Sequence, residues 1–149
     1  MAAMTTMPHL THIALHVTDI DACIDFYSVF CGMDVVHHRV AGAQRIVWMA
    51  EPQRETEFVF VIMEGGGDLH LATNDYRHFG FAMDSRQAVD KIAEQAGAEG
   101  CLAWPPRQEP YPVGYYCGLR DPNGNFVEFS YGQPLGPGAE ESKSRESLN

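Results

Sequence analysis

Hydrophobic and polar residues alternate in short runs along this chain, and the runs recur in a fixed order. Segment 12–17 (HIALHV) alternates as a β-strand does. Apolar residues then recur at helical spacing over 20–30, behind Thr18 or Asp19 as candidate N-cap, and Gly32 supplies a left-handed stop. Further β-like runs follow at about 33–41, 44–50 and 56–63. The first half of the chain is therefore predicted to be β-α-β-β-β.

The second half repeats this order, beginning 66 residues later, at His78 rather than His12. Segment 78–83 alternates, Asp84 or Ser85 can cap the helix that follows, and Gly97 is its predicted end. The later β-like runs are about 101–107, 113–120 and 125–131. The predicted fold class is α+β, with paired βαβββ modules.

The repeat also defines the expected domain organisation. One domain over 8–132 holds two modules, at about 8–64 and 76–132, joined by a glycine-rich connection. From residue 133 the sequence reads QPLGPGAEESKSRESLN, which has almost nothing to bury. Segment 133–149 is therefore expected to be a disordered tail.

Composition narrows the classes of function. The 149 residues carry a formal net charge of −10, which repels phosphate backbones and anionic lipid and so argues against nucleic acid and membranes as partners. No apolar run reaches the roughly 18 residues of a membrane span. The start lacks the features of a signal peptide, and the four cysteines form no CxxC pair. A cytoplasmic protein with reduced thiols is the expectation.

Alternation places potential metal ligands on one face of three predicted strands. His12 and His16 lie opposite the large apolar residues of the first strand, His78 does so on the fifth, and Glu128 on the last. Small residues accompany them, so this face is expected to line a cavity. Two imidazoles and a carboxylate suit one divalent ion, Fe, Ni, Zn or Mn. The alternative is a set of ordinary polar residues on a solvated sheet face; the equivalent repeat positions of His12 and His78 favour the metal.

Three segments resemble the vicinal oxygen chelate superfamily, which includes glyoxalase I, extradiol dioxygenases, fosfomycin-resistance enzymes and bleomycin-binding proteins. They are THIALHVTDIDACIDFYSVFCGM, RHFGFAMDSRQAVDKIAEQAGAEG and GYYCGLRDPNGNFVEFSYG. The resemblance implies that the paired modules form a cupped mixed sheet (a glyoxalase/dioxygenase-like fold). It also implies metal ligands at His12, His78 and Glu128, with Glu128 also the catalytic base. It further implies a homodimer, in which a site can take ligands from both chains. His16 is a candidate proton shuttle.

The branches of the family differ at positions that this sequence changes. The fourth glyoxalase ligand aligns with Phe60, and the glutathione-contacting arginine is replaced by His16. The active-site tyrosine of extradiol dioxygenases aligns with Gly118, and the threonine of fosfomycin enzymes with Ala14. Bleomycin-type binding proteins lack the ligand triad. A glyoxalase-type lyase or isomerase acting on a small oxygen-bearing molecule is favoured; Fe(II) ring cleavage and non-catalytic small-molecule binding are the alternatives.

Candidate substrate contacts are Tyr116, Arg107 and Phe60. Arg107 lies in a segment over 104–112 that is too proline-rich for a central strand. It is either a loop that closes over the site, with Arg107 meeting a substrate carboxylate, or an exposed edge loop. Cys117 is expected to be a small core residue rather than a nucleophile.

Overall fold

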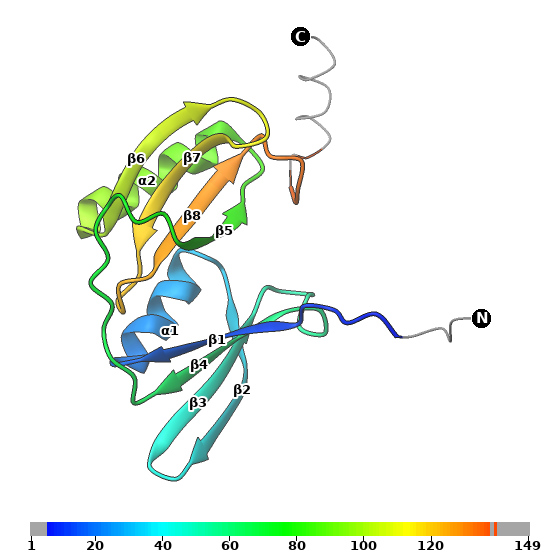
Figure 1. Cartoon of the computed structure of the whole chain (residues 1–149), viewed down its shortest axis with the longest axis vertical. Helices are drawn as coiled ribbons and strands as arrows, with labels where there is room; N and C mark the ends of the chain where they lie inside the picture. Colours follow the sequence, from blue (N-terminus) through cyan, green and yellow to red (C-terminus); the bar gives the residue numbers. More distant parts are fainter. Residues whose placement is uncertain (1–5, 138, 140–149) are drawn as a thin grey trace. The chain divides into compact units, whose positions relative to one another are not determined.

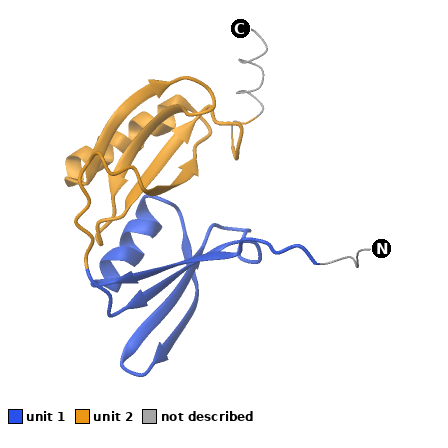
Figure 2. Cartoon of the chain, viewed as in Figure 1, with its two compact units in different colours: residues 1–67 blue, residues 68–149 orange. Residues whose placement is uncertain are grey.

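The chain forms two compact units, residues 1–67 and 68–149 (Figure 2). They are seen in a computed structural model that describes residues 6–137 and 139. Most of the expected tail, 138 and 140–149, lies outside the described residues.

Unit 1 is a four-stranded mixed sheet with one helix (Figure 1). The sheet has the order β1-β4-β3-β2, in which β1 and β4 run parallel and the other neighbours antiparallel. Its elements are β1 (His12–Val17), α1 (Ile20–Val29), β2 (Asp34–Ala41), β3 (Gln44–Ala50) and β4 (Val59–Glu64).

Unit 2 repeats the design in the order β5-β8-β7-β6, with a parallel β5–β8 pair. Its elements are β5 (His78–Ala82), α2 (Arg86–Glu99), β6 (Leu102–Glu109), β7 (Gly114–Arg120) and β8 (Phe126–Tyr131). The predicted α+β class and the paired βαβββ modules are confirmed.

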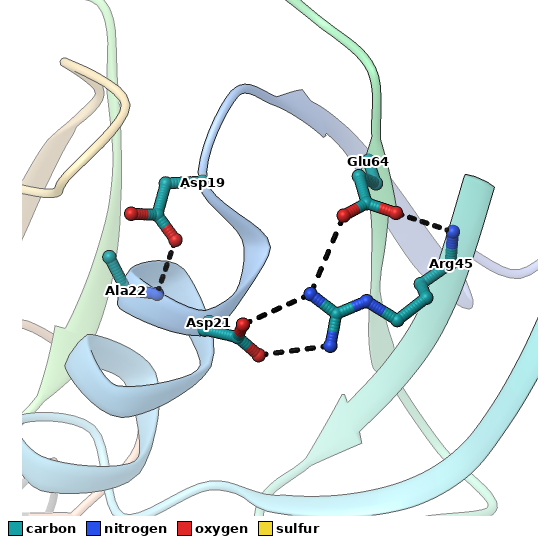
Figure 3. A network of polar contacts seen from close by, with 5 residues as sticks. All are labelled: Asp19, Asp21, Ala22, Arg45 and Glu64. Carbon is teal, nitrogen blue, oxygen red and sulfur yellow. Dashed lines mark hydrogen bonds and ion pairs between the residues drawn. The ribbon is translucent and has the colours of Figure 1, made fainter. Parts of the chain in front are cut away.

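Helix α1 begins because Asp19, not Thr18, caps it: the Asp19 carboxylate accepts a hydrogen bond from the Ala22 amide at 3.0 Å (Figure 3). Two residues on, the Asp21 carboxylate accepts hydrogen bonds from both terminal nitrogens of Arg45, at 3.0 and 3.1 Å. The same guanidinium reaches Glu64 at 3.4 Å, and the Arg45 amide donates to Glu64 at 2.9 Å. Arg45 thus joins the start of α1 to β3 and β4.

Helix α2 is capped by Ser85, whose hydroxyl accepts the Ala88 amide at 3.1 Å. The predicted end at Gly97 is wrong. The helix continues to Glu99, and Gly100 takes the left-handed conformation at φ 77°, with its amide directed to the carbonyls of Ala96 and Gly97. A Cβ at Gly97 would meet only Leu102, at the ordinary contact distance of 3.9 Å, and Gly97 does not have the positive φ that ends a helix.

In each unit the helix covers one face of the sheet. The core of unit 1 joins β1, β3 and β4 to α1 through Val17, Met49, Ile62 and Tyr27, all fully buried. That of unit 2 joins α2 to β7 and β8 through Val89, Leu119, Val127 and Phe129. The opposite faces, termed the open faces below, carry the predicted site residues His12, His16, His78 and Glu128. No helix in the described part of the chain is long and apolar enough to span a membrane.

Candidate metal and substrate site

His78 and Glu128 come together on the open face of unit 2. They lie on the neighbouring parallel strands β5 and β8. His78 is opposite Phe126, and Glu128, two residues further along β8, is opposite Gly80. The His78 Nε2 and Glu128 Oε2 atoms are 3.8 Å apart. That is too long for a hydrogen bond, and slightly longer than the roughly 3–3.5 Å between two donors that share one ion.

The imidazole of His78 is held in one orientation. Its Nδ1 lies 2.5 Å from the Tyr76 carbonyl, which can only accept, so Nδ1 carries the proton in this contact. The lone pair is then on Nε2, the nitrogen nearer Glu128. Metal-bound histidines commonly have such a second contact, which fixes their tautomer.

Glu128 is a buried carboxyl, with a side chain only 11% exposed. Burial raises its pKa, while His78 and a hydrogen bond from Gln133 oppose that rise. Gln133 was expected to begin the disordered tail; instead it contacts the candidate ligand. Its contribution was missed because an amide after the last strand gives no periodic signal.

Room for the Glu128 carboxylate comes from a glycine on each side. Gly80 and Gly118 are its register partners on β5 and β7. A Cβ at Gly80 would lie 3.1 Å from Glu128 Oε2. A Cβ at Gly118 would lie 2.1 Å from the ring of Trp104, so the Trp104 indole rests directly on this glycine.

Trp104 forms a wall beside His78. Its indole N–H donates to the Thr73 carbonyl at 3.0 Å, and its ring centroid lies 5.7 Å from that of His78 and 4.7 Å from that of Phe126. Trp104 was expected only as part of the proline-rich segment over 104–112. Residues 104–109 of that segment belong to β6, which lies at the edge of its sheet with register shifts around the two prolines, and residues 110–112 form a turn.

Two predicted substrate contacts also lie on this face. Tyr116 is opposite Ser130 and Arg107, one row from Glu128, and burial raises the pKa of its hydroxyl. Arg107 is largely exposed and forms an ion pair with Glu109 at 2.7 Å. Cys117 faces the other way, into the core, where burial raises the pKa of its thiol to about 12. A thiol so rarely ionised is a poor nucleophile.

His12 and His16 lie on the exposed face of unit 1, on β1. The His12 Nδ1 is hydrogen-bonded to the Thr11 hydroxyl at 3.0 Å, which leaves Nε2 for other partners. His12 also lines a pocket of about 240 Å³ together with Trp48 of β3, Val61 of β4 and residues 55–58.

Phe60 does not belong to this face. The β1–β4 register pairs His12 with Val59 and Ala14 with Val61, so Phe60 points to the helix side, where its ring packs against Tyr27 at 5.3 Å. Its prediction as a substrate contact is therefore wrong. The residues that do share the His12 face on β4 are Val59, Val61 and Met63, none of which can supply a fourth ligand.

The donor chemistry fits a divalent ion held by His12, His78 and Glu128. Two of the three approach each other, and both histidines have Nδ1 engaged. Within neither unit do the described residues gather three or more His, Cys, Asp or Glu side chains as a metal site.

Comparisons with known proteins agree with the fold. The sequence model of the Glyoxalase/Bleomycin resistance protein/Dioxygenase superfamily matches residues 9–129. Over 133 residues the chain is 67% identical to Uncharacterized protein PA2024 of Pseudomonas aeruginosa, covering 89% of this chain and 95% of that protein.

Two solved structures show the same fold at low identity. The trypanothione-dependent glyoxalase I of Leishmania major has a TM-score of 0.67 at 16% identity, covering 95% of each chain. A mutant of the fosfomycin resistance protein FosX of Listeria monocytogenes, complexed with Mn(II) and 1S,2S-dihydroxypropylphosphonic acid, has a TM-score of 0.65 at 19% identity, covering 84% of this chain and 93% of that one. With the family match over most of its length, this chain belongs to the Glyoxalase/Bleomycin resistance protein/Dioxygenase superfamily.

Proposed function

We propose that this protein is a divalent-metal-dependent lyase or isomerase that acts on a small molecule bearing two neighbouring oxygens. The observation that carries the proposal is the His78–Glu128 pair. A buried carboxylate lies 3.8 Å from an imidazole whose proton is committed to the Tyr76 carbonyl. His12 of unit 1 would complete the ligand set, and the Listeria neighbour, complexed with Mn(II) and a vicinal diol, supports this type of site.

The bound ion would supply Lewis-acid polarisation of the substrate's oxygens. The chain's own residues then govern the proton. Burial raises the pKa of Glu128, which makes its carboxylate a stronger base and lets it hold an abstracted proton. Gln133 donates a hydrogen bond to the same carboxylate and so fixes its direction. His16, on the open face of unit 1, is the proposed second proton carrier.

Trp104 favours this chemistry over ring cleavage. Extradiol dioxygenases would place their tyrosine at Gly118, but the Trp104 indole occupies the space that any side chain there would need. Tyr116 is on the correct face, yet it lies in the next row of the sheet, opposite Ser130. Ring cleavage by Fe(II) therefore lacks its expected acid-base group at the expected position.

We further propose a cytoplasmic homodimer. All eight residues of β2 are exposed, among them Val35, Val36 and Val40 at 47%, 42% and 61%. Apolar side chains along an edge strand are typical of a surface that a partner covers. A second copy of the chain is the proposed partner.

Metal content tests the ligand assignment. Untagged protein should bind about one equivalent of Mn(II), Ni(II), Zn(II) or Fe(II) per chain, as the proposed single site requires. His12→Ala and Glu128→Ala should each lose most of it while keeping the wild-type circular dichroism spectrum. His70→Ala, which removes an exposed histidine that lies in no helix or strand, is the matched control and should keep it. Full metal content in Glu128→Ala would refute that ligand.

Reaction class is tested on the loaded protein. With hydroxyacetone in D2O, exchange of the hydrogens next to the carbonyl should be faster with wild type than with Glu128→Gln, as followed by proton NMR. Dioxygen uptake with catechols by Fe(II)-loaded protein, without such exchange, would instead establish the dioxygenase. Tight ligand binding by protein that takes up no metal would establish a binding protein.

A further inference from the structure

The pocket beside His12 in unit 1 has no assigned role. We propose that it receives an aromatic, uncharged or cationic substituent of the substrate, whose paired oxygens lie near His12. The proposal rests on the proposed metal function and adds the class of substrate. The pocket has a volume of about 240 Å³ and opens on the same sheet face as His12.

The walls of the pocket are suited to a ring. Trp48, Phe58 and Val61 provide two aromatic planes and an aliphatic floor. Trp48 is 39% exposed although tryptophan is largely apolar, and the His37 ring contacts it with centroids 5.5 Å apart. A flat apolar ligand would remove this surface from water, which is the main source of affinity in small-molecule pockets.

The size is compatible with a substituted six-membered ring. An apolar cavity of about 150 Å³ in another protein accepts benzene, so a pocket of this volume has space for a ring and a further group. His12 is itself part of the lining, so a ring in the pocket lies beside the imidazole that is proposed to bind the metal.

Charge at the rim selects against anions. Glu55 and Glu57 both line the pocket. Arg54 neutralises Glu57 through a contact of 2.8 Å and also pairs with Glu51 at 3.0 Å, which leaves an excess of negative charge around the rim. An aromatic carboxylate would meet like charge there, whereas a neutral or cationic ring would not.

Binding of three hydroxamates to metal-loaded, full-length protein tests the proposal. Acetohydroxamate, benzohydroxamate and 4-carboxybenzohydroxamate present the same two oxygens with a methyl group, a phenyl ring and a charged ring. By calorimetry, benzohydroxamate should bind at least about tenfold more tightly than acetohydroxamate, because the ring is buried. The 4-carboxy probe should lose most of that gain.

Two variants locate the effect. Val61→Phe fills the pocket from β4, and Trp48→Ala removes its aromatic wall; each should abolish the preference for the phenyl probe while metal content stays at wild-type level. Either variant suffices if the other does not fold. Val29→Phe, which adds the same ring at a 60% exposed position on α1 outside the pocket, is the matched control and should keep the preference.

The outcomes separate the two proposals. Equal affinity of acetohydroxamate and benzohydroxamate for metal-loaded wild type would overturn the pocket assignment and leave the metal function standing. In another outcome, wild type binds benzohydroxamate equally well with and without metal, and Val61→Phe binds it much more weakly. That result would support the pocket and overturn the metal function. Equal affinity of the two ring probes would overturn the charge selection.

Discussion

Glu128 lies in a row of the sheet from which neighbouring side chains are missing. Gly80 and Gly118 flank it, and the Trp104 ring covers the second of these glycines. The carboxylate is therefore enclosed without being crowded. Burial of this kind raises its pKa and still leaves one oxygen 3.8 Å from His78.

Gly118→Ala tests how closely this row is packed. Alanine normally stabilises a strand relative to glycine, but here its Cβ would lie 2.1 Å from the Trp104 ring. The variant should lose about 1–3 kcal/mol of unfolding free energy in urea titrations. Gly67→Ala, whose added Cβ would meet no atom within 4 Å, is the control and should be nearly neutral. A Gly118→Ala protein as stable as wild type would contradict the close contact. Adding Trp104→Ala should cost less than the sum of the two single changes.

Some residues of the candidate site could be predicted and others could not. The period of two along a strand placed His78 and Glu128 on one face, because that rule depends only on local backbone geometry. Phe60 was misplaced because an alignment without gaps was off by one residue, and one residue in a strand reverses the face. Trp104 acts through contacts with residues distant in sequence, and Gln133 contacts Glu128 from beyond the end of the last strand; periodicity records neither contact.

At the scale of elements, the order and type of all ten helices and strands in the described residues followed from periodicity and turn residues. Some boundaries of these elements differ from the prediction. Strand β4 begins at Val59 rather than near 56, because residues 54–58 form a turn in which Arg54 pairs with Glu51 and Glu57. Helix α2 passes Gly97, since a single glycine costs a helix only about 1 kcal/mol and packing can offset it.

The cap of α1 should matter more than its surface charge. Asp19→Ala removes the acceptor for the Ala22 amide and should lower the unfolding free energy by about 1 kcal/mol. Asp25→Ala removes the same charge from an exposed position inside the helix and should cost much less. Thermal melts at low and high salt compare them. Equal losses in the two variants, disappearing in salt, would mean that charge and not capping is responsible.

At the scale of the whole molecule, the proposed ligands are divided between the two units: His12 belongs to unit 1, and His78 and Glu128 to unit 2. Mixing variants distinguishes a site within one chain from a site shared across a dimer. If sites are shared, His12→Ala and Glu128→Ala chains refolded together in equal amounts should regain about one quarter of wild-type metal. Half of the dimers are then mixed, and each mixed dimer has one intact site of two.

Co-refolding with no recovery, while each variant alone forms normal dimers by light scattering, would instead place all three ligands in one chain. A monomeric wild type would refute the proposed homodimer itself. The control is the same mixture of His12→Ala with His70→Ala. Its metal content should not exceed the amount that the His70→Ala chains bind by themselves.

The contact between Trp104 and Gly118 also bears on how such a protein could change its chemistry over generations. A tyrosine at 118 needs the space that the indole fills, so it requires the loss of Trp104 at the same time. Losing Trp104 first would expose the buried Phe126 and leave the Thr73 carbonyl without its donor. Either first step passes through a less stable ancestor, so the two positions are expected to change as a pair, and descendants that keep the tryptophan inherit the restriction.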